Sequence, residues 1–201
     1  MEIVHSGEVG GLRYVYSDRQ SLGKIRSEEN VLWSFAPHDI SMVLALIDEQ
    51  PIEVTAQGAA FVDPAIADVA TVQLMFAGGV RADIRVSWLH FRKVQQIVAL
   101  CERGTIVFED SQPEWNRKLS IHEHVVELEN GVPVPRRGPV RYIDAPYEEP
   151  LRNECVHFLQ CIAEGKGPLT DGREGKAVLR VLQQASSAMA GHARSPEKVD
   201  E

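Results

Sequence analysis

Two runs in which apolar residues occupy alternate positions, one on each side of a glycine pair, constrain the fold of this chain more than any other feature. In residues 69–76 apolar side chains occupy every second position, and the same alternation returns in residues 80–89. Ala77-Gly78-Gly79 lies between the two runs. A period of two places the apolar side chains of a strand on one face, and a glycine turn between two such strands is typical of a β-hairpin. The first element that the sequence predicts is therefore an antiparallel hairpin.

Other segments show the same strand pattern. A second hairpin is expected from two apolar runs that turn at Glu102-Arg103-Gly104. The segments expected to be strands outside the first hairpin are residues 12–18, 52–62, 95–101, 105–109 and 119–126. Residues 132–150 are rich in proline and arginine and are expected to form an extended loop across the surface.

Apolar residues at helical spacing indicate several helices. The segments expected to be helical are residues 1–6, as the tail of a short helix, 34–48, 149–164 and a last helix that begins at Asp171. Strands joined mostly by hairpins, with helices gathered toward the chain ends, predict an α+β fold with an open, predominantly antiparallel sheet and helices on one face. We expect residues 1–191 to form one substrate-binding and oligomerisation domain, followed by a polar C-terminal tail at residues 192–201.

Charge and cysteine content exclude some classes of function. The net charge of −8 argues against non-specific binding to nucleic acid or to anionic membranes, both of which need a basic face. The longest apolar runs are far shorter than a membrane span. The three cysteines, Cys101, Cys155 and Cys161, show no C-x-x-C spacing. We therefore expect reduced thiols in a cytoplasmic protein.

The candidate catalytic residue is His38, in the first turn of the helix expected at residues 34–48. Ile40, Val43, Leu44 and Ile47 form the apolar stripe of that helix, and His38 lies on a different side. Ser34 is a plausible N-cap, and the positive end of the helix dipole favours neutral imidazole. Neutral imidazole can accept a proton from an alcohol. The alternative is a histidine that caps its own helix or bonds a neighbouring backbone group.

Basic and aromatic residues near this helix are candidates for substrate binding. Arg19, Lys24 and Arg26 lie in a polar segment before the helix and would suit a phosphate or carboxylate, although basic loop residues are usually just solvated. Trp33 and Trp88 could stack on a sugar ring, although a half-buried tryptophan is first of all a core residue. We assign Ser34, one turn before His38, to the same group.

The sequence also contains residues that could bind a metal. His122 and His124 project from one face of a predicted strand, and with His90 they could form a three-histidine metal site of the cupin type; the alternative is exposed strand histidines. The sequence contains no G-x-G-x-x-G after a strand and no G-x-x-x-x-G-K-[ST], so we expect no bound cofactor on this chain alone. No motif of a nucleophilic serine or cysteine triad can be recognised in the sequence.

The second face of the predicted sheet is half polar. Arg81, Asp83 and Arg85 lie opposite the apolar face of their strand, among apolar residues of neighbouring strands. Such a face is either solvated or an interface between copies of the chain.

Three segments together resemble a known family. Residues 33–46, with Ala36-Pro37-His38-Asp39-Ile40 at their centre, resemble the helix that carries the active-site histidine in the glucose–fructose oxidoreductase, inositol dehydrogenase and MocA family. Ser87-Trp88-Leu89 with the hairpin of residues 95–110, and the helix starts at residues 149–154 and 170–172, are similar to the rest of that family's C-terminal half, a dihydrodipicolinate reductase-like domain. Members with this histidine segment look most like those that act on nucleotide-linked amino sugars.

The resemblance implies a function for the complete enzyme. It would be an NAD- or NADP-dependent oxidoreductase that acts on a hydroxyl of a sugar or nucleotide sugar, and His38 would relay or abstract the hydroxyl proton. The family's nucleotide-binding domain and its catalytic lysine have no counterpart in these residues, and Ser34 stands where many members have an acid. The chain by itself should therefore not turn over. The expected partners are the sugar substrate, a separate Rossmann-domain chain and further copies through the sheet face. The alternative is a non-catalytic sugar-binding or scaffold protein of the same fold.

Overall fold

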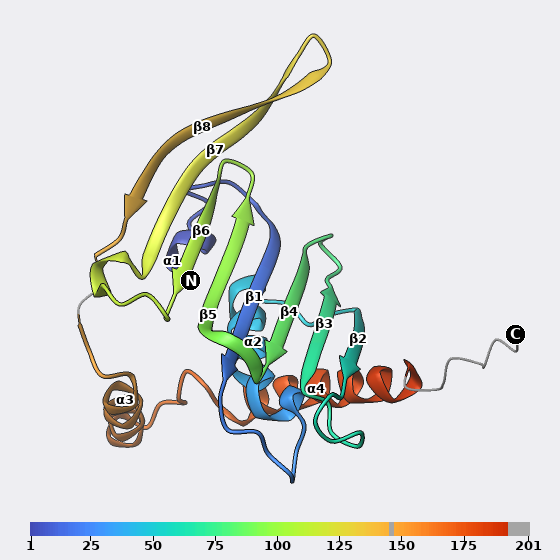
Figure 1. Cartoon of the computed structure of the whole chain (residues 1–201). Coiled ribbons are helices and arrows are strands. Elements are labelled where there is room, and N and C mark those ends of the chain that lie inside the picture. Colours follow the sequence, from blue (N-terminus) through green and yellow to red (C-terminus); the bar gives the residue numbers. More distant parts are fainter. Residues whose placement is uncertain (145–146, 193–201) are drawn as a thin grey trace, which may run out of the picture.

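The computed structural model describes residues 1–144 and 147–192 (Figure 1). Residues 193–201 of the predicted C-terminal tail lie outside the described residues. The elements, in chain order, are α1 (Glu2–His5), β1 (Leu12–Leu22), α2 (Val31–Ile47), β2 (Glu53–Ala59), β3 (Val69–Met75), β4 (Arg81–Ser87), β5 (Leu89–Cys101), β6 (Gly104–Glu109), the 3₁₀ turn η1 (Trp115–Arg117), β7 (Leu119–Glu129), β8 (Val132–Tyr142), α3 (Pro150–Glu164) and α4 (Gly172–His192).

One sheet contains all the described strands, in the order β2-β3-β4-β1-β5-β6-β7-β8. Every neighbouring pair is antiparallel except β1 and β4, which run parallel. The helices α2 and α4 pack on each other and on the β1–β4 half of the sheet (Figure 1). The predicted α+β fold with a mainly antiparallel sheet is confirmed, and so are the two hairpins β3–β4 and β5–β6.

The main core lies between this helix pair and one face of the sheet. Alternate residues of the strands, such as Ile84 and Val86, point toward it, and Trp88, directly after β4, is fully buried. The indole Nε1 of Trp88 donates to Asp68 Oδ1 at 2.5 Å, so its polar atom is satisfied. A smaller apolar cluster joins α1 to β5, β6 and β7.

The start of α2 differs from the prediction. The helix begins at Val31, and its N-cap is Asn30, whose side chain accepts from the Trp33 N–H at 3.3 Å. The predicted N-cap Ser34 is therefore wrong; it lies inside the helix, as does Pro37. The reason is tertiary, because Val31 is fully buried in the core and its N–H bonds to the Ala67 carbonyl at 3.0 Å.

Two further predictions of local structure are corrected. The strand β1 continues to Leu22, so Arg19 lies on a strand and not in the predicted loop. Most of the loop expected at residues 132–150 is also wrong, because β8 pairs with β7 across a turn at Asn130-Gly131. Both turn residues have positive φ, 53° and 82°, which a two-residue hairpin turn of type I′ requires. The prolines of β8 are accommodated because it is an edge strand.

The helix α3 stands apart from the sheet (Figure 1). Among its residues, Cys161 is the one buried side chain. The apolar residues that recur at helical spacing along α3 form a stripe that is therefore uncovered; they are Leu151, Cys155, Phe158, Leu159 and Ile162. Phe158 is 56% exposed and Ile162 is 63% exposed. The last helix, α4, buries Val181 and Leu182, whereas Leu179 is half exposed.

The face of the sheet opposite α2 and α4 is half polar, as the sequence predicts. Tyr14 stacks on Tyr16 there and donates to Asp83 Oδ2 at 2.8 Å. Arg85 pairs with Asp18 at 2.8 Å. Arg85 and Asp18 thus balance each other within the face, whereas Asp83 Oδ1 is buried without a hydrogen-bond partner among the described residues.

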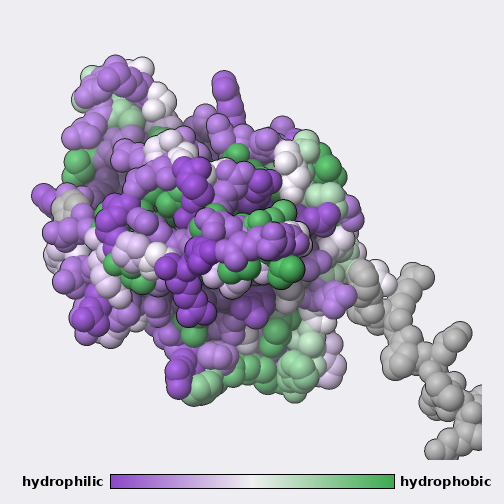
Figure 2. Space-filling view, turned by 90° about the horizontal axis from the view of Figure 1, so that it is seen from above, coloured by the Kyte–Doolittle hydropathy of each residue, from purple (hydrophilic) through white to green (hydrophobic). Residues whose placement is uncertain are grey.

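The surface seen from above is mostly hydrophilic, with hydrophobic residues in smaller groups (Figure 2). In the part of the chain that the structure describes, no helix is both long and apolar enough to cross a membrane.

Candidate functional site

His38 lies on the exposed side of α2 and lines an open cavity of about 760 Å³. The walls of this cavity come from α2, from the first half of α4 and from β5 and β6. Among the described residues the imidazole of His38 makes no hydrogen bond and no ion pair, so it does not cap its own helix. It is therefore free to contact a ligand.

The helix dipole acts less on His38 than the sequence indicated. Because the helix begins at Val31, His38 lies in the third turn and not in the first. The effect of the dipole falls off within the first turn. The argument for neutral imidazole from the helix N-terminus therefore does not hold.

Arg19 reaches the same cavity from β1, where it is held by a buried acid. Its Nε lies 2.7 Å from Oδ2 of Asp39, the residue after His38. The other oxygen, Oδ1, accepts from the Ser17 hydroxyl at 2.7 Å. Asp39 is 1% exposed and Arg19 about a fifth, so the pair forms part of the cavity floor.

Gln95 and Asp110 extend this polar floor. When the Gln95 amide is oriented to satisfy both neighbours, it accepts from Arg19 Nη1 and donates to Asp110 Oδ2, each at 3.3 Å. Asp110 Oδ1 is paired with Lys118 Nζ at 2.6 Å. Sequence reasoning missed these residues, because they come from the far side of a hairpin and carry no local motif.

A second acid, Glu174, was also missed. It accepts from the hydroxyl of Ser41, one turn after His38, at 2.5 Å and lines the cavity from α4. The preceding Asp171 caps α4, because its Oδ1 accepts from the backbone N–H groups of Arg173 and Glu174. The backbone hydrogen bonds from Glu174 and Arg173 lower the pKa of the Asp171 carboxyl. The start of α4, which the sequence predicts at Asp171, is the signal that could have placed Glu174 in the first turn of that helix.

The predicted substrate-binding residues divide into two groups. Trp33 lines the cavity beside His38, and its Nε1 donates to Ser186 Oγ of α4 at 2.8 Å. Ser34 does not line it, and its buried hydroxyl has no partner among the described residues. Lys24 and Arg26 lie in an exposed loop outside the cavity, where Arg26 pairs with Glu29 at 3.1 Å.

The structure does not assemble the three-histidine metal site. His122 Nε2 bonds to Ser120 at 3.0 Å, and His124 Nε2 bonds to Thr105 at 2.8 Å. His90 bonds to the backbone of Arg92. No group of three metal-ligating side chains occurs within residues 1–144 and 147–192.

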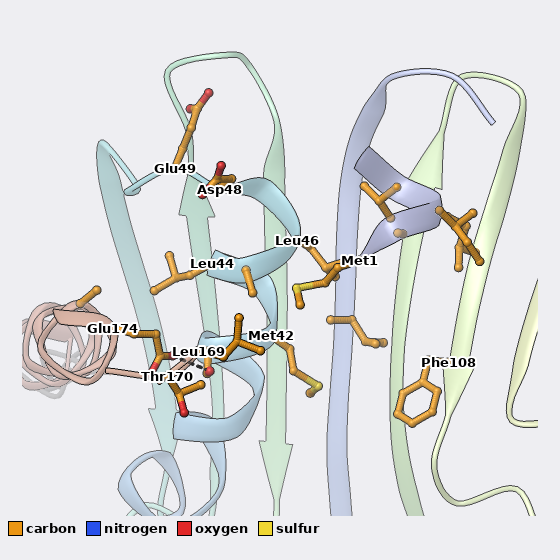
Figure 3. Close-up of a pocket in the computed structure, with 18 of the residues that line it drawn as sticks. Met1, Met42, Leu44, Leu46, Asp48, Glu49, Phe108, Leu169, Thr170 and Glu174 are labelled. Atoms are coloured by element: carbon orange, nitrogen blue, oxygen red, sulfur yellow. Dashed lines mark hydrogen bonds between the residues drawn. The ribbon is translucent and has the colours of Figure 1, made fainter. Parts of the chain in front are cut away.

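A second, mostly apolar cleft adjoins the His38 cavity. Its volume is about 830 Å³, and Figure 3 shows it between α2, the start of the chain and β6, with Met42, Leu46 and Phe108 on its walls. The two hollows share a wall, formed by Ser41, Met42, Ile97, Phe108 and Glu174. Leu169, from the segment that joins α3 to α4, also lines the cleft.

The GFO/IDH/MocA C-terminal domain model matches residues 1–107, which is more than half of the chain and includes His38. The chain belongs to the GFO/IDH/MocA family. Curated relatives include the UDP-N-acetylglucosamine 3-dehydrogenase of Acidithiobacillus ferrooxidans, 28% identical over 184 residues, which cover 90% of this chain and 55% of the relative. The inositol 2-dehydrogenase of Rhizobium meliloti is 28% identical over 159 residues, which cover 76% of this chain and 45% of the relative.

Solved structures of two oxidoreductases share the fold. The A. ferrooxidans dehydrogenase matches with a TM-score of 0.79 at 22% identity, over 96% of this chain and 60% of that one. The aldose-aldose oxidoreductase of Caulobacter crescentus matches with a TM-score of 0.72 at 18% identity, over 95% of this chain and 57% of that one. The chain thus spans about half the length of the relatives that it matches.

Proposed function

We propose that this chain is the substrate-binding half of an NAD(P)-dependent oxidoreductase that acts on a hydroxyl of a sugar or nucleotide sugar, such as the 3-hydroxyl of a UDP-amino sugar. The observation that carries the proposal is His38. It is an exposed imidazole without a partner among the described residues, in a cavity of a size that holds small ligands, on a helix inside the family match. Two of the curated relatives are named as dehydrogenases, one of UDP-N-acetylglucosamine and one of inositol, which supports the same reaction class.

The cavity residues suit a hydroxylated ligand. His38 would accept the proton of the reacting hydroxyl, a role that imidazole performs near neutral pH. Trp33 offers an aromatic surface for a sugar ring, and Arg19 and Gln95 offer donors and acceptors at the floor. Lys24 and Arg26 would contact a part of the substrate that extends beyond the cavity. Ser34 does not line the cavity, so it would not contact the substrate directly.

The residues of this chain do not themselves fit a dinucleotide. The sequence has no glycine-rich turn for a pyrophosphate, and the described lining of the His38 cavity includes no lysine. NAD or NADP would therefore be bound by a nucleotide-binding domain, in the same or a separate polypeptide. The uncovered stripe of α3 and the apolar cleft at Met42 are surfaces suited to such a domain, and the shared wall would bring it against His38.

A second copy of the chain would cover the half-polar face of the sheet. Tyr14 and Tyr16 form an aromatic patch there, and the Arg85–Asp18 pair balances its own charges. A two-fold interface places a surface against itself, so a surface that carries both signs of charge avoids repulsion. In the described part of the chain Cys101, Cys155 and Cys161 are free thiols, which supports a cytoplasmic location.

Two titrations test the proposal. UDP-N-acetylglucosamine added to the purified chain should quench Trp33 and leave a Trp33→Phe variant unchanged. NADH should show no saturable energy transfer from the tryptophans, and the chain alone should show no turnover. Saturable binding of NADH would contradict the assignment of the cofactor to another domain, whereas no binding of any sugar or sugar nucleotide would contradict the substrate role.

The second candidate is a sugar-binding protein of this fold without catalysis. The observation that favours it is Ser34, which stands where many family members have an acid and whose hydroxyl has no partner among the described residues. Fusion of the chain to the part of the A. ferrooxidans dehydrogenase that it does not match separates the two. Turnover that is lost in His38→Gln supports the oxidoreductase, and a fusion that binds NADH and the sugar nucleotide without turnover supports the second candidate.

A further inference from the structure

We infer that the cavity at His38 receives an uncharged polyhydroxyl unit and discriminates against carboxylate and phosphate groups, with Asp39, Asp110 and Glu174 as the specificity-determining residues. This rests on the proposed function, because it takes the cavity to be the place where the sugar binds. The inference identifies the part of the substrate that enters the cavity.

The positive charge of Arg19 is already balanced. The carboxylate of Asp39 is buried and touches Arg19 Nε at 2.7 Å, and its other oxygen is held by Ser17. A guanidinium in such a pair still donates hydrogen bonds from its remaining N–H groups. It offers little net attraction to an anion, because the carboxylate cancels its field at the distance of a ligand.

The other charged groups on the cavity wall are acids. Asp110 is balanced by Lys118 from outside the cavity. Glu174 is bonded to the neutral hydroxyl of Ser41, and no cation pairs with it among residues 1–144 and 147–192. Glu174 therefore leaves one uncompensated negative charge. The basic residues Lys24 and Arg26 do not reverse it, because they lie outside the cavity.

Carboxylates accept hydrogen bonds and donate none when they are ionised. The hydroxyl groups of a sugar are donors, so Glu174 and Asp110 can bind them, while Arg19 supplies the complementary donors. A carboxylate or phosphate at the same place would bring like charges together in a partly desolvated site. A neutral ring is thus favoured inside the cavity, and an anionic part of the substrate has to remain outside it.

The test uses a matched pair of ligands that differ at one carbon, methyl β-D-glucopyranoside and methyl β-D-glucuronide. Dissociation constants are measured at pH 7 by NMR titration of the full chain. The neutral glycoside should bind at least about tenfold more tightly. Glu174→Gln keeps the acceptor for Ser41 and removes the charge, so it should narrow that ratio. Glu53→Gln, an exposed acid on β2 outside the cavity, is the matched control and should leave the ratio unchanged.

Each outcome decides the inference. Equal or tighter binding of the glucuronide by the wild-type chain overturns it and leaves the proposed function standing. An equal change of the ratio in both variants, or no change in Glu174→Gln, overturns the role of Glu174. If neither glycoside binds although UDP-N-acetylglucosamine does, the inference is overturned and the proposed function stands. If none of the three ligands binds, the proposed function fails together with the inference.

Discussion

Arg19 Nε and Asp39 Oδ2 lie 2.7 Å apart, and this contact ties β1 to α2 directly beneath the candidate site. Asp39 follows His38 in the chain, so the ion pair fixes the backbone that carries the imidazole. Ser17 on the same strand holds the second oxygen of Asp39. One buried acid thus connects the core of the sheet with the floor of the cavity.

Removal of Asp39 should destabilise the protein strongly. Asp39→Ala leaves the guanidinium of Arg19 largely buried without a counter-charge, which costs about 3–5 kcal/mol of the free energy of unfolding. Arg26→Ala is the matched control, because Arg26 is 44% exposed in its pair with Glu29 and should lose no more than about 1 kcal/mol. Urea unfolding followed by circular dichroism measures both. Equal effects would mean that the Asp39 pair adds nothing beyond a surface ion pair.

His38→Gln should leave stability almost unchanged and lower activity. The imidazole is exposed and bonds to no other described residue, so the free energy of unfolding should change by less than about 0.5 kcal/mol. In a fusion that turns over, loss of a general base should lower kcat by about 10²- to 10⁴-fold with a smaller change in KM. A stable variant with unchanged kcat would remove His38 from the chemistry.

The fold could be predicted where its signals are local. The alternation in β3 and β4 and the turns between the strands need only neighbouring residues to be recognised. The hairpin β7–β8 carried the same kind of signal at Asn130-Gly131, but the prolines of the following segment favoured a loop. They are compatible with a strand because β8 lies at the sheet edge, a position that the sequence does not state.

The candidate site was predicted only in part. Arg19, Trp33 and His38 meet in one cavity, and the sequence points to all three because they lie in α2 or in the segment before it. Gln95, Asp110 and Glu174 join them from distant parts of the chain, so no spacing in the sequence reveals them. The helix start failed for a similar reason: Asn30 and Ser34 are both good N-caps, and burial of Val31 decides between them.

Trp33 should report ligand binding by its fluorescence. It lines the cavity and its Nε1 is bonded to Ser186, so a ligand changes the surroundings of an indole that is otherwise fixed. Trp88 is fully buried, and Trp115 lies outside the cavity lining. The quench produced by UDP-N-acetylglucosamine should therefore vanish in Trp33→Phe and persist in Trp115→Phe. A quench that persists in Trp33→Phe would place the ligand elsewhere.

Tyr14 should make the protein sensitive to alkaline pH. Burial, together with the hydrogen bond to Asp83, raises the pKa of the Tyr14 phenol to about 12 from its ordinary value of 10.0. Because the folded-state pKa is the higher one, the unfolded chain loses this proton first. The stabilisation is complete below pH 10 and is lost as the pH rises toward 12.

The variant Tyr14→Phe tests this sign. In urea unfolding at several pH values, the free energy of unfolding should decline more steeply between pH 10 and pH 12 for the wild type than for Tyr14→Phe. Tyr16→Phe is the control, because Tyr16 is exposed and its hydroxyl has no described hydrogen bond. An identical decline in the wild type and in Tyr14→Phe would show that the phenol does not cause it.

The stripe of α3 should be dispensable for folding and necessary for a partner domain. Phe158 is exposed, so Phe158→Ser should change the free energy of unfolding by less than about 0.5 kcal/mol. Leu182→Ala in the buried stripe of α4 should lose about 2–5 kcal/mol, because it opens a cavity in the core. In the fusion with the unmatched part of the A. ferrooxidans dehydrogenase, Phe158→Ser should lower the temperature of unfolding although it leaves the chain alone unaffected. If Phe158→Ser destabilises the chain alone as much as Leu182→Ala does, then α3 packs within this chain and its stripe is not an interface.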